Sequence, residues 1–572
     1  MQYFVITLLC WTFSAAAEGQ ALAPSEKDYF GDMPIILSVS RLPQPLNETP
    51  GAVTVIDRDM IRLSGARDVP ALMRLVPGFQ VTEAYESGSP QAVYHGGFGD
   101  FSNRIQVLID GRSVYSPFFV GTSGNGLQTI ALDDIERIEV LRGSNSAAFG
   151  ARAFLGVINI VTRVPLDTLC VHVSKSSGER GVNDGLLQLG WGNEAANFRL
   201  TASRRGDDGL TSIFGYDHYT KVTDFLNGPY GRNHVSLANF RADLHPDSMN
   251  TLEFRAGASA QYSGTGNSFV PGNPQRQRRV AASYLQADWR RVLGENADLA
   301  VSLSHSDETF TDNFPYQPIP QLLIDFGGSA SNDSLLVQHS FRSGESLRFV
   351  WGGELRREAV RSMPLYNQPL LTTNFRRLFG NLEWRISPSL LLNAGALEEH
   401  SSLTGSAFSP RLMLNWHAAP QHTLRFGVTQ AQRPPSMFEK AANIRYVLNN
   451  ILLDETNVSR GNVQPERILA REFGYLGEIQ ALRMSADVRV FHEAIDGFIR
   501  TERYVDTRYV PPKFPTDFVN SDNFPIRGIE LQLKFRPWRD TQVIFNQSNI
   551  KIVSEKLEVA MAAPTHASSL AL

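Results

Sequence analysis

The chain has 572 residues, a formal net charge of -4 and two cysteines, Cys10 and Cys170. The balanced charge, with no basic run interleaved with aromatics, gives no indication of a nucleic-acid partner. With Cys10 in a segment that we expect to be cleaved, the cysteine count excludes a disulfide framework and a thiolate metal site, while length alone leaves the domain count open.

The N-terminus has the pattern of an export signal. Residues Phe4 to Ala17 are almost all apolar, and Ala15, Ala16 and Ala17 offer small residues at a cleavage position. Such a run of about fourteen residues is too short to span a membrane as a helix. We predict a signal peptide over residues 1–17, with cleavage as late as Ala23 as an alternative. No Lys or Arg precedes the run, and a buried N-terminal strand is the other interpretation.

Residues 24–50 form a polar segment with prolines and without periodicity, which predicts an extended tail. A short apolar island, Asp32 to Val39, interrupts it.

Residues 51–165 have the pattern of one mixed α/β domain. Ala52 to Ile56 predicts a strand, and a short helix follows it up to Gly65. Asp68 is a candidate N-cap for a helix that stops at Pro77-Gly78. The turn Asp110-Gly111 lies between two strands within Ile105 to Tyr115 and predicts a hairpin. The β-branched run Val157 to Thr162 predicts a further strand.

From residue 166 onward, apolar and polar residues alternate. Ile529, Leu531 and Leu533 fall on one face of a predicted strand, and Glu530, Gln532 and Lys534 on the other. Alternation alone does not separate a soluble sandwich from a membrane barrel. Short turns, however, are spaced by spans that each hold two strands and one longer loop, as in outer-membrane barrels. The turns are expected near Gly192, Pro246, Gly294, Gly344, Pro388, Pro420, Gly477 and Trp538.

Counting through these turns predicts about seventeen complete strands, with an eighteenth starting near Pro564. A barrel of that width has a lumen that is either open or filled. We expect the mixed domain that precedes the barrel to fill its lumen.

Five stretches in the same order make the chain resemble the TonB-dependent outer-membrane receptors: LMRLVPGFQV, VLIDGRSVY, DIERIEVLRGSNSAAFGARAFLGVINIVTR, RPPSMFE and GNVQPE. The resemblance implies a mostly β fold, with an N-terminal α/β plug inside an antiparallel transmembrane β-barrel of the 22-stranded type. The domains would be a tail (24–50), a plug (51–165) and a barrel (166–572). With about 22 strands expected, the barrel would be incomplete at its C-terminus, through either a fragment or a frameshift.

The resemblance also implies residues that seat the plug by salt bridges to the barrel. The candidates are Glu136, Arg137, Glu139 and Arg142, because buried charges are costly unless paired. Solvated charges on an edge strand are the alternative. The plug departs from the family's usual pattern at Ser144, Phe149 and Leu155, and at His95, where arginine often precedes glycine.

The apolar island resembles a TonB box, which binds the energy-coupling protein TonB, itself working with ExbB and ExbD, as an added strand. Its residues are Asp32, Met33, Pro34, Ile35, Ile36, Leu37, Ser38 and Val39. Packing on the plug is the alternative role.

The implied activity is import of a ferric siderophore by a monomer in the outer membrane, without cofactor, metal site or catalytic set. Aromatic loops of the plug supply stacking surface for a chelate, although such residues also pack on one another. Cobalamin or another chelate is an alternative cargo, and a passive porin, an outer-membrane enzyme or a non-functional truncated receptor are alternative classes. No histidine lies between Met437 and Arg460, which argues against haem. The ligand-binding candidates are Tyr85, Tyr94, His95, Phe98, Phe101, Tyr115, Phe118 and Phe119.

Overall fold

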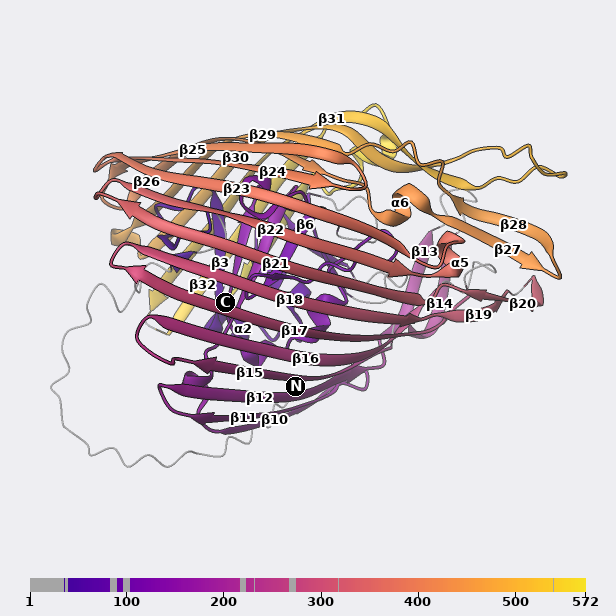
Figure 1. Cartoon of the computed structure of the whole chain (residues 1–572), viewed down its shortest axis with the longest axis horizontal. Helices are drawn as coiled ribbons and strands as arrows, with labels where there is room; N and C mark the ends of the chain where they lie inside the picture. The colour runs from indigo at the N-terminus through magenta and orange to yellow at the C-terminus, as the bar shows by residue number, and fades with distance from the viewer. Residues whose placement is uncertain are drawn as a thin grey trace.

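A small mixed domain lies inside a large curved antiparallel sheet (Figure 1). The computed structural model describes residues 35–36, 40–82, 90–95, 103–216, 223–230, 232–266, 274–316, 318–538 and 540–572. The predicted signal peptide, residues 1–17, lies outside the described residues.

The inner domain is built on a five-stranded sheet. Its strands follow the order β3 (Ala52–Asp57), β8 (Ile135–Arg142), β9 (Gly156–Thr162), β6 (Ile105–Ile109) and β7 (Arg112–Ser113), with β6 and β9 parallel. The Asp110-Gly111 turn has φ of 47° and 81°, as the predicted two-residue hairpin requires.

Short helices cover this sheet and begin where the sequence places N-caps. The Asp57 carboxylate accepts a hydrogen bond from the Met60 amide at the start of α2 (Arg58–Leu63). Asp68 does the same for Ala71 in α3 (Val69–Leu72), which continues as η1 (Met73–Leu75). The hairpin β4 (Phe79–Thr82) and β5 (Gln91–Tyr94) and the helix α4 (Ser146–Phe149) complete the domain.

The outer sheet is a continuous series of neighbouring antiparallel strands. Among the described residues the series has eighteen members, because β26 pairs directly with β29 and the hairpin between them joins the sheet through one residue pair with β31. They are β10 (Val171–Ser177), β11 (Asn183–Gly192), β12 (Ala196–Asp207), β15 (Asn233–Leu244), β16 (Asn250–Thr265), β17 (Arg276–Gly294), β18 (Ala297–Thr311), β21 (Gly328–Ser343), β22 (Leu347–Arg361), β23 (Leu371–Ser387), β24 (Leu390–Ser401), β25 (Gly405–Ala419), β26 (His422–Arg433), β29 (Glu466–Ile479), β30 (Met484–Arg503), β31 (Thr516–Trp538), β32 (Thr541–Ile552) and β33 (His566–Ala571). The predicted strand count is confirmed.

The two ends of the sheet differ. At one end, here called the short-turn end, strands are joined by brief turns at the predicted places, except that Gly477 lies inside β29 and the turn follows at η5 (Gln480–Leu482). The sequence prediction stopped that strand too early, because a glycine within a strand reads as a turn. At the opposite, long-loop end lie α5 (Met363–Tyr366), α6 (Met437–Ala441) and the hairpins β13 (Leu210–Tyr216) with β14 (Thr223–Tyr230), β19 (Asn313–Tyr316) with β20 (Ile319–Asp325), and β27 (Asn443–Leu448) with β28 (Ile451–Val458) (Figure 1). The helix α7 (Leu557–Ala560) connects β32 to β33, and its Val559 packs in the same core cluster as the plug.

The alternation in the strands separates an outer apolar face from an inner polar face. On β31, Ile529 is 42% exposed while the neighbouring Glu530 is fully buried against the inner domain. Leu285, Leu355 and Leu378 on other strands are likewise exposed. β10 and β33 stand at the two ends of the series, and each is paired on one side among the described residues. No described helix is both long and apolar enough to cross a membrane.

Candidate functional site: the contact between plug and wall

The inner domain, which we call the plug, meets the wall at a buried corner formed by Tyr94 and His95. His95 adopts a φ of 52°, which turns its ring toward the wall at the end of β5. Its imidazole is stacked between the rings of Tyr94 and Phe491, at centroid distances of 3.7 and 4.6 Å. Phe79 continues the stack at 4.8 Å from Tyr94. The plug therefore inserts an aromatic column against β30.

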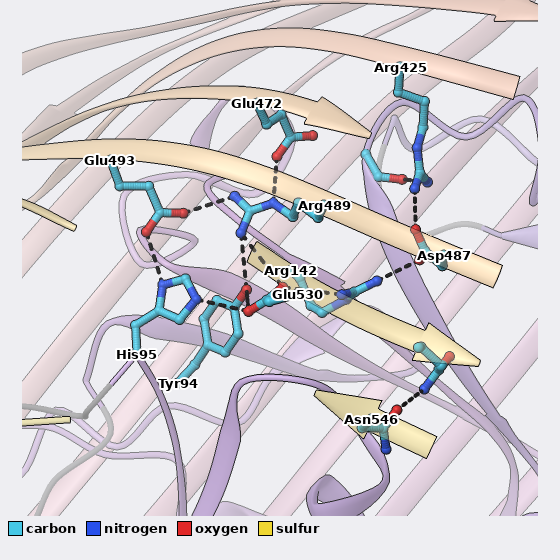
Figure 2. A network of polar contacts seen from close by, with 12 residues as sticks. Tyr94, His95, Arg142, Arg425, Glu472, Asp487, Arg489, Glu493, Glu530 and Asn546 are labelled. Carbon is cyan, nitrogen blue, oxygen red and sulfur yellow. Dashed lines mark hydrogen bonds and ion pairs between the residues drawn. The ribbon is translucent and has the colours of Figure 1, made fainter. Parts of the chain in front are cut away.

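Both ring nitrogens of His95 face carboxylates of the wall (Figure 2). Nδ1 lies 3.0 Å from Glu493 Oε2, and Nε2 lies 2.9 Å from Glu530 Oε1. A neutral imidazole would point a lone pair at one carboxylate, so this geometry fits the doubly protonated ring. Burial lowers the pKa of His95, but attraction and hydrogen bonds from Glu493 and Glu530 outweigh it and raise that pKa above its ordinary value.

Arginines complete the network around this histidine. Arg142 of the plug donates to Asp487 at 2.5 Å and to Glu530 at 3.1 Å. Arg489 of β30 donates to Glu493 at 2.9 Å and, through Nη1, to the Tyr94 hydroxyl at 3.1 Å. We call the whole set the β30–β31 contact: Tyr94, His95, Arg142, Arg425, Glu472, Asp487, Arg489, Glu493 and Glu530 (Figure 2).

Each arginine and the histidine of this contact meets at least one carboxylate, which is the condition under which buried charges are tolerated. The close approach depends on glycine. A Cβ on Gly78 would lie 2.4 Å from Glu530 Oε1, and one on Gly143 would lie 2.6 Å from Arg489 Nη2. These positions explain two of the glycines that punctuate the plug sequence.

Further ion pairs join the plug to other parts of the wall. Arg104 pairs with Glu466 at 2.6 Å and Arg152 with Glu358 at 2.7 Å. Nearer the other edge of the series, the plug pairs are Arg67 with Asp184 at 2.8 Å, Asp110 with Arg255 at 3.0 Å, and Asp134 with Arg199 at 3.1 Å. The plug is thus contacted from many strands.

The four residues predicted to seat the plug separate into two groups. Arg142 lies in the β30–β31 contact. Arg137 and Glu139 pair with each other on β8 at 2.9 Å, and Asn159 of the plug also donates to Glu139. Glu136 is 4.0 Å from Arg163 of the plug, and its side chain is 45% exposed. For these three the recorded ion pairs are internal to the plug.

The predicted ligand-binding aromatics also lie in different places. Tyr94 and His95 are buried in the β30–β31 contact, while Tyr85, Phe98 and Phe101 fall outside the described residues. Phe118 stacks on Phe310 at 4.0 Å, and Phe119 lies 4.2 Å from the ring of Phe438 in α6. Tyr115 is buried beneath the Arg152 guanidinium, 3.5 Å from its ring centroid. Tyr115, Phe118 and Phe119 form the apex of the plug at the long-loop end.

Of the predicted TonB box, the structure describes Ile35 and Ile36, and its other six residues lie outside the described part. These two form β1 (Ile35–Ile36), which pairs with β2 (Gln44–Pro45). The Ile36 side chain is 1% exposed and packs in a plug cluster with Val53 and Val157.

The segment that follows is held at the short-turn end of the wall. Arg348 donates to the Pro43 carbonyl at 2.7 Å, and Arg385 pairs with Glu48 at 2.5 Å. Arg348 is the second residue of β22 and Arg385 lies two residues before the end of β23, both near short turns. The start of the plug and its aromatic apex therefore lie at opposite ends of the wall.

Sequence reasoning missed the carboxylates that receive the plug. Glu493 and Glu530 occupy the polar face of alternating strands, and that alternation is the signal that could have identified them as lumen residues. Which plug residue each one meets had no local signal, since His95 and Glu530 are 435 positions apart.

Comparison with known proteins identifies the class. A model of the TonB-dependent receptor plug domain matches residues 45–157, and a model of the TonB-dependent receptor-like β-barrel matches residues 176–557. The chain therefore belongs to the TonB-dependent receptors. The predicted fold, an α/β plug within a large antiparallel sheet of barrel type, is confirmed, and so is the outer-membrane location.

Proteins similar to this chain are found both by sequence and by structure. The iron-regulated outer membrane virulence protein of Vibrio cholerae serotype O1 is 26% identical over 453 residues, which cover 75% of this chain and 63% of that protein. The ferric enterobactin receptor PirA of Pseudomonas aeruginosa is 22% identical, over 75% of this chain and 66% of that protein. The crystal structure of the siderophore receptor PirA from the same species has a TM-score of 0.68 at 16% identity, covering 88% of this chain and 85% of that one. The chain thus spans 63% of the length of the Vibrio relative.

Proposed function

We propose that this protein imports a ferric siderophore across the outer membrane, driven by TonB with ExbB and ExbD. The observation that carries the proposal is the polarity of the plug. Its start lies at the short-turn end beside Arg348 and Arg385, and its aromatic apex lies at the long-loop end beside Phe310 and Phe438. A plug held by buried ion pairs has to be displaced before cargo passes, which requires energy.

The names of the relatives support iron as the cargo. The Vibrio relative is named as iron-regulated, and PirA as a ferric enterobactin receptor. A vitamin B12 transporter, BtuB of Vibrio vulnificus, is 29% identical over 203 residues, 35% of this chain, and keeps cobalamin as the second candidate.

TonB binding would use the segment from Asp32 to Val39. In the structure β1 pairs with β2 along one backbone edge, so strand addition by TonB would use the other edge or displace β2. The pairing covers two residues, and exposing the Ile36 side chain costs about 1.5–3 kcal/mol. If β2 is displaced, net gains of about 0.5–1.5 kcal/mol for each backbone hydrogen bond of an added strand can offset a cost of this size.

Deleting residues 32–39 tests the proposal. We expect the variant to bind ferric ligand as the parent does but to lose uptake, measured as accumulation of radioactive iron by cells that depend on this receptor. A matched deletion of the eight tail residues before this segment, 24–31, should retain uptake. Unchanged uptake after deletion of 32–39 would contradict the TonB-box assignment.

The cargo is tested by titrating the purified chain with ferric siderophores and corrinoids and following tryptophan fluorescence. Saturable quenching by a ferric siderophore is the expected result. Quenching by corrinoids alone would show that the cargo is cobalamin and not a ferric siderophore. Steady ion conductance through planar bilayers without any ligand would favour the porin interpretation.

A further inference from the structure

An arginine-rich cavity lies between the plug hairpin β6–β7 and the wall strands β18, β21 and β22. Its volume is about 40 Å³, enough for a monatomic anion or a few waters and far too small for a chelate. Small hydroxyl groups from β18 and β21 line one side. We call this region the arginine seam, and its polar members are Arg41, Arg112, Arg356, Arg377, Glu354, Gln106, Asn332, Ser113, Ser302, Ser304, Ser306 and Ser334.

The one carboxylate that lines the seam is already occupied. Glu354 accepts hydrogen bonds from Arg377 Nη1 at 2.8 Å and from the Ser334 hydroxyl at 2.9 Å. Arg377 also pairs with Glu399. Three further arginines of the seam are left to find other acceptors.

Arg356 has fewer hydrogen-bond acceptors than its guanidinium N–H groups require. Its side chain is 4% exposed, and its Nε lies 3.3 Å from Glu358. Glu358, however, is gripped by both terminal nitrogens of Arg152, at 2.7 and 2.8 Å. Neither Nε nor Nη2 of Arg356 has a hydrogen-bond acceptor among the described residues. A buried guanidinium with unpaired N–H groups is costly, so an acceptor is missing here.

Arg112 and Arg41 reach the same cavity from the plug. Arg112 donates to the Ser306 hydroxyl at 3.3 Å and stacks 3.9 Å from the Tyr284 ring centroid, yet its Nε also has no acceptor within the described part of the chain. Arg41 donates to the Ala148 carbonyl at 2.7 Å and lies over Phe379. Burial lowers the pKa of Arg41 to about 10, an effect that the attraction of Glu354 only partly offsets.

We propose that the arginine seam binds one small anion, of the size of a halide ion, between Arg356 of the wall and Arg112 and Arg41 of the plug. The anion supplies the acceptor that the unpaired N–H groups lack and offsets the excess of positive charge. It bridges plug and wall without any direct carboxylate partner. The site does not depend on which cargo the receptor carries.

The position of Arg41 gives the anion a mechanical consequence. Arg41 lies two residues after the segment 32–39, so a pull on that segment reaches the seam early. Loss of the bound anion would then weaken the hold of the wall on Arg41 and Arg112 together, leaving their contacts with Phe379, Tyr284 and Ser306.

Bromide is the probe for this site, because its anomalous scattering locates it directly. Crystals of the purified chain grown in sodium bromide should show an anomalous peak in contact with Arg356 and Arg112. The peak should be absent in Arg356→Gln and retained in Arg357→Gln, a matched control whose side chain is exposed on the opposite face of β22. No peak in the seam of the parent, or peaks on the outer surface only, would overturn the proposal.

A solution measurement covers the case in which Arg356→Gln does not fold. Thermal unfolding is compared in bromide and in gluconate, which is too large for the cavity, at equal ionic strength. The parent and Arg357→Gln should unfold at a higher temperature in bromide, whereas Arg356→Gln and Arg112→Gln should lose most of that shift and bind bromide about tenfold more weakly. An equal shift in all four proteins would mean an adventitious ion only. Iron uptake plays no part in either readout, so these results are separable from those on the proposed function.

Discussion

The plug meets its wall in two different ways on two sides. In the β30–β31 contact, Asp487, Glu493 and Glu530 project from the wall and each receives a cation. In the arginine seam, the corresponding inward positions of β18 are Ser302, Ser304 and Ser306, and N–H groups of Arg112 and Arg356 have no acceptor among the described residues. One architecture thus yields a charge-paired contact on one side and a contact short of acceptors on the other.

The difference indicates where the plug is held and where it can separate. Removing a buried ion pair's partner costs several kcal/mol, so the β30–β31 contact resists opening. A surface that lacks acceptors gains from water or anions and separates at lower cost. We expect the plug to part from β18 and β21 before it parts from β30 and β31, whereas β22 is also held to the plug by the Arg152–Glu358 pair.

The largest expected effect is from Arg142→Met. The substitution leaves Glu530 and Asp487 buried with fewer cations, which should lower the free energy of unfolding by about 3–5 kcal/mol. Denaturant titration of the purified chain measures it. Arg62→Gln is the control on the same domain, since its pair with Asp59 is exposed and should contribute under about 1 kcal/mol. If both variants lost the same free energy of unfolding, the β30–β31 contact would contribute no more than an exposed ion pair, which would contradict the account.

The second prediction is that the stability of the β30–β31 contact, which contains His95, depends on pH. Because the folded-state pKa of His95 is raised, its contribution is fully present below about pH 6.5 and is lost as the pH rises through the folded-state value. Thermal unfolding should therefore show a decline above neutral pH that His95→Gln flattens. The facing groups Glu493, Glu530, Arg142 and Arg489 are carboxylates and guanidinium groups, which do not themselves change charge at neutral pH. His245→Gln, in an exposed turn, should behave as the parent, and an unchanged profile in His95→Gln would contradict the assignment.

The smallest expected effect comes from giving the seam the acceptor it lacks. Ser304→Glu places a carboxylate on the seam's wall, where it can pair with a neighbouring guanidinium. We expect a gain of about 1 kcal/mol or less and loss of the bromide-dependent shift in unfolding temperature. Ser304→Gln, of similar size but neutral, should keep the shift. A bromide shift that survives in Ser304→Glu would place the anion elsewhere.

Much of the fold can be predicted from the sequence, because alternation and helix capping are local patterns. Alternation places Glu530 inward and Ile529 outward, and Asp68 begins its helix as a side-chain cap. Gly477 misled the turn prediction because glycine also occurs within strands. Local patterns of this kind do not predict which residues far apart in the sequence contact each other.

The site was less accessible to prediction for the same reason. Arg142 could be proposed as a seating residue, but its partners lie more than 300 positions away, and the similarly charged Arg137 pairs within its own strand. Tyr94 and His95 have the composition of a ligand loop, yet they are buried because the facing strand offers Phe491 and two carboxylates. Only the three-dimensional arrangement distinguishes these roles.

Hydrogen exchange of the purified chain, followed by mass spectrometry, tests the two-sided account most directly. Arg142→Met should speed exchange in β8, which carries Arg142, and leave β7 unchanged. Arg356→Gln should speed exchange around β7 and the segment from Ser40 to Gln44 and leave β8 unchanged. If both variants accelerate the same peptides to the same extent, the plug is held as one unit and the account is contradicted.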